Sequence, residues 1–164
     1  MKNIILNNEQ INQKINRIAY QIYEINCIES ELVIVGISGN GFQLALRIKE
    51  SLEKISPLKI ILCELKIDKK NPLNSITTSI PLESLQNLSV VLVDDVLNTG
   101  KTLIYGVAYF IQVPLKQLKT AVLINRNHKK YPVKADFKGL SLSTTSQEHI
   151  SIEIINDVFT AYLK

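Results

Sequence analysis

The stretch Val90-Val91-Leu92-Val93-Asp94-Asp95-Val96-Leu97-Asn98-Thr99-Gly100-Lys101-Thr102 decides the fold of this chain. Its first four residues are apolar and mostly β-branched, which predicts a buried strand. Two carboxylates stand where that strand is expected to end, and a short loop of small and hydroxylated residues follows them. Helical spacing resumes at Leu103. In an open α/β sheet, ligands bind just outside the carboxyl ends of the strands, so we expect a binding site here.

The residue types in this stretch suit a ribose phosphate. Asp94 and Asp95 are placed to hold sugar hydroxyls, or a metal ion bound to them. The backbone N–H groups of residues 98–102 and the hydroxyls of Thr99 and Thr102 are suited to cradle a phosphate at the helix start. An alternative is that the paired acids only complement the helix dipole. A nucleoside-triphosphate loop is excluded, because Asp95 occupies the position of its first glycine.

Composition predicts a single globular domain covering residues 1–164. Hydrophobic residues make up 46% of the chain and charged residues 21%, which argues against disorder. The net charge of +4 suits a polyanionic ligand without selecting one. Cys27 and Cys63 show no metal or redox spacing, and we expect both to be buried free thiols of a cytoplasmic protein. No signal peptide or membrane span is expected.

Strand and helix patterns alternate along the chain. Helical spacing covers 11–25, 42–52 and 103–111, with Asn7 or Asn8 as the cap of the first helix. Strands are expected at 32–35, 60–65, 90–93, 118–124, 135–139, 150–155 and 159–163, with loops at 36–41 and 141–148. Residues 66–78 are polar and predict a mobile flap or an exposed hairpin. The fold class is therefore α/β, with a mainly parallel, Rossmann-like sheet flanked by helices.

The opening stretch resembles the phosphoribosyl-diphosphate (PRPP) binding motif of type I phosphoribosyltransferases. Within that superfamily the chain is similar to the bifunctional pyrimidine-operon attenuator/uracil phosphoribosyltransferase family. Besides the PRPP motif, residues 17–22, 33–37, 121–139 and 143–146 carry the likeness. The resemblance implies the type I fold with a flexible flap at residues 66–78. It also implies transfer of ribose 5-phosphate from PRPP to a nucleobase, uracil in that family, with release of pyrophosphate.

Roles for individual residues follow from the resemblance. Asp94 and Asp95 would be the catalytic acids and hold the ribose hydroxyls, directly or through Mg²⁺. They would bind PRPP together with Val96, Leu97, Asn98, Thr99, Gly100, Lys101 and Thr102. The pyrophosphate loop would be Ser38-Gly39-Asn40-Gly41, and Arg126 and Asn127 would face the base. A homo-oligomer, dimer or tetramer, is also implied, and RNA is a further partner of the family.

The chain departs from that family at several positions. Gly39-Asn40 stands where the family has a Thr-Arg pair, which removes a bidentate pyrophosphate contact. The flap is shortened, and Asn98, Asn125 and Gln147 replace a tyrosine, an acid and a basic residue. Two alternatives therefore stand beside the enzyme: a nucleotide-sensing RNA-binding regulator, and a catalytically reduced nucleotide-binding module. We read His128 as a solvent-facing loop residue and His149 as structural or exposed.

Overall fold

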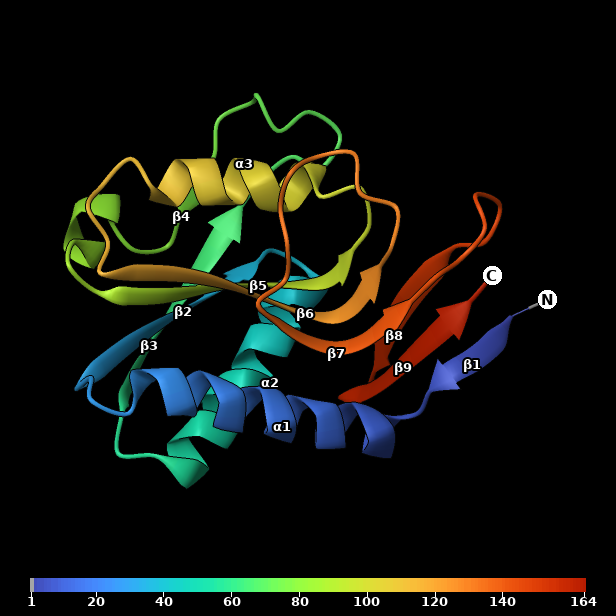
Figure 1. Cartoon of the computed structure of the whole chain (residues 1–164), viewed down its shortest axis with the longest axis horizontal. Coiled ribbons are helices and arrows are strands. Elements are labelled where there is room, and N and C mark those ends of the chain that lie inside the picture. The colour runs from blue at the N-terminus through green and yellow to red at the C-terminus, as the bar shows by residue number, and fades with distance from the viewer. Residues whose placement is uncertain (1) are drawn as a thin grey trace.

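The structure, a computed structural model, describes residues 2–164. Most of the strands in these residues belong to one sheet. The sheet has the order β4-β3-β2-β5-β6-β7 (Figure 1). Its strands are β2 (Glu31–Ile37), β3 (Lys59–Lys66), β4 (Thr77–Thr78), β5 (Ser89–Leu97), β6 (Gln117–Arg126) and β7 (Phe137–Leu142). β3, β2, β5, β6 and β7 run parallel, and the short β4 runs antiparallel to β3. The predicted α/β fold with a mainly parallel sheet is confirmed.

Helices cover both faces of this sheet. α1 (Asn8–Asn26) and α2 (Asn40–Ile55) lie on one face, and α3 (Lys101–Phe110) lies on the other with the 3-10 helix η1 (Leu82–Leu85) (Figure 1). β2 is consequently buried on both sides: Leu32 and Ile34 pack with α1 and α2, whereas Val33 and Val35 pack on the side of α3. This two-sided burial explains why the strand is a continuous apolar run instead of an alternating one.

The first helix begins at a complete capping box. The side chain of Asn7 accepts a hydrogen bond from the backbone N–H of Gln10 at 2.9 Å, and the side chain of Gln10 accepts one from the N–H of Asn7. Such a cap stabilises a helix by about 1 kcal/mol. Of the two predicted caps, Asn7 is therefore the correct one.

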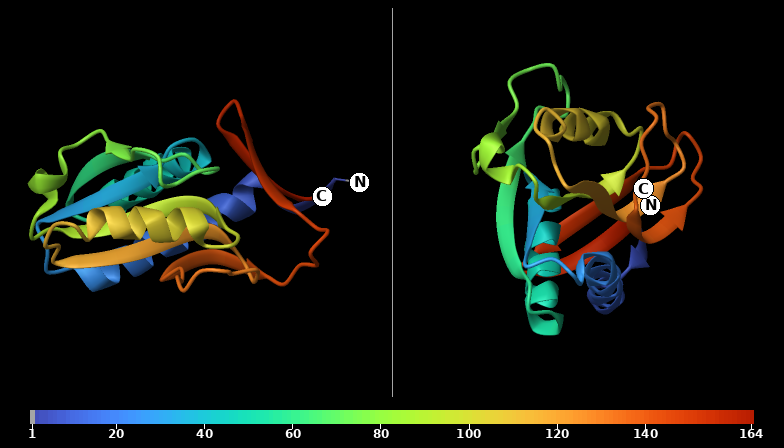
Figure 2. Two further views of the ribbon diagram at one scale, coloured as in Figure 1. Left: turned by 90° about the horizontal axis from the view of Figure 1, so that it is seen from above. Right: turned by 60° about the vertical axis from the view of Figure 1, so that its left-hand side comes forward.

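A second, antiparallel sheet joins the two ends of the chain. Its order is β1 (Asn3–Leu6), β9 (Val158–Leu163) and β8 (Ile150–Ile155). It stands at the end of the main sheet, as the view from above shows (Figure 2). The strands expected at 150–155 and 159–163 exist, but they belong to this second sheet, and β1 was not predicted. The pairing of Asn3 with Leu163 is a contact between chain ends, which local sequence patterns do not reveal.

Three local predictions were wrong. β5 does not end at Val93 but continues to Leu97, because it keeps its parallel pairing with β6 as far as Asn125. β7 begins at Phe137, two residues later than predicted, and runs to Leu142, so part of the expected loop is strand. Cys27, expected to be buried, is exposed at the end of α1, while Cys63 is buried as predicted.

None of the helices within residues 2–164 is both long enough and apolar enough to cross a membrane.

Candidate active site

A cavity of about 300 Å³ opens at the carboxyl ends of β2 and β5. After β2 the chain adds β3 on one side of it, and later adds β5 on the other side. The direction in which strands are added therefore reverses between β2 and β5, which is the switch point of the sheet. Ligand sites of open α/β sheets form at such points. The lining residues are Asn40, Lys69, Asp94, Asp95, Val96, Leu97, Asn98, Thr99, Gly100, Lys101, Thr102, Leu103, His149, Ile150, Ser151 and Ile152. All nine residues predicted to bind PRPP are among them.

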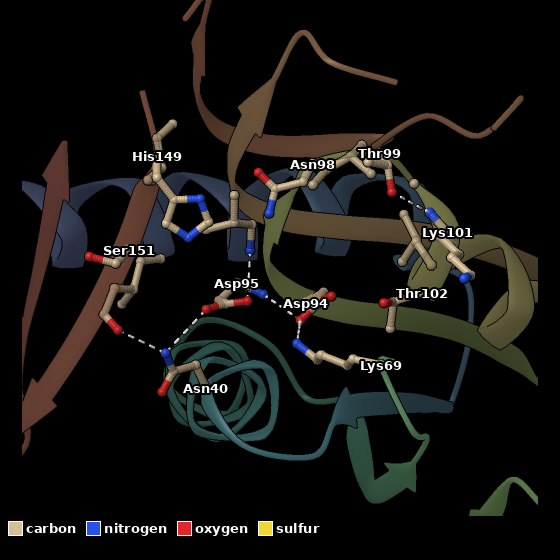
Figure 3. Close-up of a pocket in the computed structure, with 16 residues that line it drawn as sticks. Asn40, Lys69, Asp94, Asp95, Asn98, Thr99, Lys101, Thr102, His149 and Ser151 are labelled. Atoms are coloured by element: carbon tan, nitrogen blue, oxygen red, sulfur yellow. Dashed lines mark hydrogen bonds and ion pairs between the residues drawn. The ribbon is translucent and has the colours of Figure 1, made fainter. Parts of the chain in front are cut away.

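The two acids lie at the centre of the cavity (Figure 3). Oδ1 of Asp94 accepts a hydrogen bond from the backbone N–H of Asp95, and Oδ1 of Asp95 accepts one from the N–H of Val96, each at 2.9 Å. The second carboxylate oxygen of Asp95 accepts a bond from Nδ2 of Asn40 at 3.2 Å. Both carboxylates are thus oriented by the strand that carries them.

Burial makes the charge of Asp94 costly. Its side chain is buried, and this desolvation, together with the charge of Asp95, raises the pKa of Asp94 to about 7. The ammonium group of Lys69, 3.4 Å from Oδ1 of Asp94, acts in the opposite direction and lowers this pKa. The centre of the cavity therefore favours a ligand that brings positive charge or hydrogen-bond donors to these acids.

The loop after β5 has the geometry of a phosphate cradle. Gly100 has a φ of 84°, a left-handed conformation that a glycine adopts without strain, and α3 begins at the next residue. The N–H groups in the first turn of a helix have no acceptors within the helix. In α3 the N–H of Lys101 donates to the hydroxyl of Thr99 at 3.3 Å, and the N–H groups after it are available to an anion. The carbonyl of Thr99 accepts bonds from the N–H groups of Lys130 and Tyr131 at 2.8 and 3.1 Å, which fixes the loop from outside.

The predicted pyrophosphate loop contributes one side chain to the cavity. That residue is Asn40, whereas the hydroxyl of Ser38 is turned away and donates to Glu64 at 2.9 Å. Gly41 lets the start of α2 approach β5 closely, because a Cβ there would lie 3.0 Å from Oδ1 of Asp94. Gly39, with a φ of 92°, faces open space.

Residues 66–78, predicted to be a mobile flap or an exposed hairpin, form a hairpin. β3 and β4 pair antiparallel, Leu65 with Thr78 and Lys66 with Thr77, and residues 67–76 connect them. Asp68 organises the turn by accepting bonds from the N–H groups of Lys70 and Asn71 and from the side chain of Asn74. This arrangement carries Lys69 to Asp94, a contact that the sequence did not predict.

The wall of the cavity opposite the phosphate loop comes from β8. His149 and Ser151 lie on this side, while Thr99, Lys101 and Thr102 lie on the other side of the acids (Figure 3). Oγ of Ser151 and Oδ1 of Asn98 are buried and have no hydrogen-bond partner within residues 2–164. This wall was not predicted, and its only local signal in the sequence is a histidine that directly follows a hydroxyl-rich loop.

Arg126 and Asn127 do not line the cavity. The guanidinium of Arg126 is buried and donates to the hydroxyl of Thr144 and to the carbonyls of Thr145 and Glu148. The amide of Asn127 donates to the hydroxyl of Ser143 at 3.2 Å. Both side chains thus hold the loop that leads into His149.

Comparisons with known proteins agree with this architecture. Residues 1–155 match the profile of the phosphoribosyl transferase domain. The Bifunctional protein PyrR of Clostridium kluyveri is 33% identical, over 94% of this chain and 91% of that protein. The PyrR protein of Macrococcus caseolyticus is 32% identical, over 99% of both chains. Among solved structures, the hypoxanthine phosphoribosyltransferase of Trypanosoma cruzi matches with a TM-score of 0.74 and 19% identity, over 85% of this chain and 81% of that one, and shares the fold. The chain therefore belongs to the phosphoribosyltransferase family.

Proposed function

We propose that this phosphoribosyltransferase transfers ribose 5-phosphate from PRPP to uracil and releases pyrophosphate. The observation that carries the proposal is the order of groups along one cavity: a phosphate loop, two acids, and a strand edge (Figure 3). A nucleoside monophosphate presents its phosphate, ribose and base in the same order. The resemblance to the pyrimidine-operon attenuator/uracil phosphoribosyltransferase family supports uracil as the base.

The 5′-phosphate and the ribose would bind at the carboxyl end of β5 and at the loop that follows it. The first turn of α3 and the hydroxyls of Thr99 and Thr102 would bind the 5′-phosphate. Asp94 and Asp95 would then meet the ribose hydroxyls. As pyrophosphate leaves C1 and a base nitrogen attacks it, positive charge develops on the ribose. The two carboxylates are placed to stabilise that charge electrostatically.

Mg²⁺ is the cofactor that fits this site. Asp94 and Asp95 supply hard oxygen ligands, which this ion prefers. Within residues 2–164 no three His, Cys, Asp or Glu side chains gather into a metal site. Mg²⁺ commonly keeps waters and substrate phosphates as its other ligands, so two carboxylates suffice. When bound with PRPP, the metal would neutralise charge on the pyrophosphate leaving group.

The base subsite that we infer lies along β8. His149 and Lys164 exchange both backbone hydrogen bonds, so in this antiparallel pair the N–H and C=O groups of Ile150 and Ile152 point away from β9. Ile150 and Ile152 line the cavity, and the carbonyl of Ile152 accepts a bond from Asn40. The strand edge therefore offers backbone donors and acceptors to a planar base, and the exposed His149 ring lies beside it.

A turnover screen tests the proposal. Purified protein with Mg²⁺ and PRPP is offered uracil, cytosine, hypoxanthine, guanine and adenine, and pyrophosphate release is measured. We expect release with uracil. Release with another base alone would contradict the choice of base, and no release with any base would contradict the enzymatic proposal. Calorimetric binding of uridine monophosphate (UMP) without turnover would instead favour the catalytically reduced module.

A second candidate function is nucleotide-dependent RNA binding. The exposed Lys129 and the neighbouring Lys130 lie in the loop whose backbone is bonded to Thr99 of the phosphate loop. A ligand at Thr99 would therefore act on a basic surface segment through two hydrogen bonds. We expect RNA affinity to increase with UMP and to fall as salt rises, with a slope set by the number of phosphates contacted. An RNA affinity that is the same with and without UMP would contradict this coupling.

A further inference from the structure

Asn40 connects the two halves of the cavity. It is the first residue of α2, and its side-chain nitrogen donates to Oδ2 of Asp95 at 3.2 Å and to the carbonyl of Ile152 at 2.9 Å (Figure 3). Asp95 belongs to the main sheet and Ile152 to the second sheet. One amide group therefore bridges an acid and the strand edge that faces it.

Both donors of this amide are in use. An asparagine side chain has two N–H hydrogens and one carbonyl oxygen. Its partners here, a carboxylate and a backbone carbonyl, are acceptors only, so the nitrogen must face them. The remaining Oδ1 accepts hydrogen bonds and would repel the anionic oxygens of pyrophosphate. The side chain at this position therefore has no donor left for the leaving group.

We propose that Asn40 is a positioning residue for the acid and the base subsite, and not a ligand of pyrophosphate. Its two hydrogen bonds fix the Asp95 carboxylate and the edge of β8 at one separation. That separation determines how well ribose and base are bound at the same time. Pyrophosphate would be held by backbone N–H groups of residues 39–41, because the N–H of Ser38 already donates to the carbonyl of Leu65 at 2.8 Å. This inference rests on the proposed function, because it assigns Asn40 a role in the same site.

The substitution Asn40→Ala separates the two roles. Alanine is a better helix former than asparagine, so the start of α2 is preserved. Affinities for UMP and for pyrophosphate are measured separately by calorimetry with Mg²⁺ present. We expect UMP affinity to fall about tenfold, as for the loss of hydrogen bonds to a charged group, and pyrophosphate affinity to change less than about twofold. Gln43→Ala, an amide exposed one turn away on α2, is the matched control and should change neither affinity.

A second variant distinguishes a change in the site from a loss of folding, because it should change the two affinities in opposite directions. Asn40→Arg introduces a donor-rich side chain, and we expect tighter pyrophosphate binding with weaker UMP binding. Thermal unfolding of each variant verifies that it is folded. Loss of pyrophosphate affinity with unchanged UMP affinity in Asn40→Ala would overturn the inference, as would no change in either. If the unaltered protein does not bind UMP at all, the proposed function itself is wrong. If the unaltered protein binds UMP and Asn40→Ala binds it equally well, only the inference fails.

Discussion

The ammonium nitrogen of Lys69 lies 3.4 Å from Oδ1 of Asp94, although the two residues belong to different segments at the site. Lys69 is in the hairpin after β3, and Asp94 is on β5. The lysine side chain is about half exposed, whereas the carboxylate is almost fully buried. The hairpin thus supplies a cation at the point where we propose that Mg²⁺ and ribose approach.

Replacing this cation should strengthen metal–substrate binding. In Lys69→Met, the competing ammonium is gone and Asp94 keeps its burial. We expect the calorimetric affinity for Mg²⁺–PRPP to rise about threefold, which corresponds to less than 1 kcal/mol and suits a half-exposed ion pair. Lys70→Met, the exposed neighbour in the same hairpin, is the control and should leave the affinity unchanged. A weaker affinity in Lys69→Met would show that the lysine binds PRPP instead of competing with it.

Asp94→Asn should stabilise the protein while it greatly reduces activity. The amide keeps the shape of the side chain and can still accept the bond from the N–H of Asp95, but it buries no charge beside that residue. We expect the free energy of unfolding to rise by about 1 kcal/mol, and kcat to fall by about a hundredfold. Denaturant unfolding and turnover measure the two effects.

Asp95→Asn is the matched comparison. Asp95 is less buried than Asp94, so we expect the same loss of activity with a smaller change in stability. Retained activity in Asp95→Asn would refute its proposed role, and a destabilised Asp94→Asn would contradict the burial argument.

Gly100→Ala should damage the phosphate loop. A Cβ at this position meets both a left-handed backbone and Cγ1 of Val133 at 2.5 Å. We expect the free energy of unfolding to fall by about 2 kcal/mol, and UMP affinity to fall with it. Gly39→Ala meets no neighbour within 4 Å, so its loss of stability should come from backbone strain alone, at φ 92° and ψ −134°. Val133→Ala should partly rescue Gly100→Ala, and absence of rescue would exclude the steric cause.

Arg126 and His149 should affect UMP binding for different reasons. Arg126→Met leaves the carbonyls of Thr145 and Glu148, at the ends of two partly buried hydrogen bonds, without their donor. We expect a loss of about 2 kcal/mol in stability together with weaker UMP binding. His149→Ala changes an exposed ring at the cavity and should weaken UMP binding with a stability change below about 0.5 kcal/mol. If Arg126→Met weakens UMP binding at full stability, the arginine contacts the base directly, as the family resemblance implies.

The sequence by itself determined the parts of the site that are continuous in the chain. The run from Asp94 to Thr102 carries its own turn glycine and helix start, and both need only neighbouring residues to form, whereas the extent of the strand before them depends on pairing with β6. The cap at Asn7 is local in the same way, because its partner is three residues away. Continuous apolar runs likewise predicted the parallel strands, since burial on both faces removes alternation.

Only the tertiary structure decided what faces that run. The second sheet pairs residues from the two ends of the chain, so local patterns predicted the strand at 150–155 but not its place in the cavity wall, and they did not predict β1. Arg126 was expected to face the base, and in the structure its guanidinium donates to three acceptors in residues 144–148 and lies outside the cavity lining. The partners of Asn40 lie 55 and 112 residues away, and their positions depend on the register of β5 and β8. Short-range chemistry fixed the ribose-phosphate half of the site, and packing between distant segments fixed the other half.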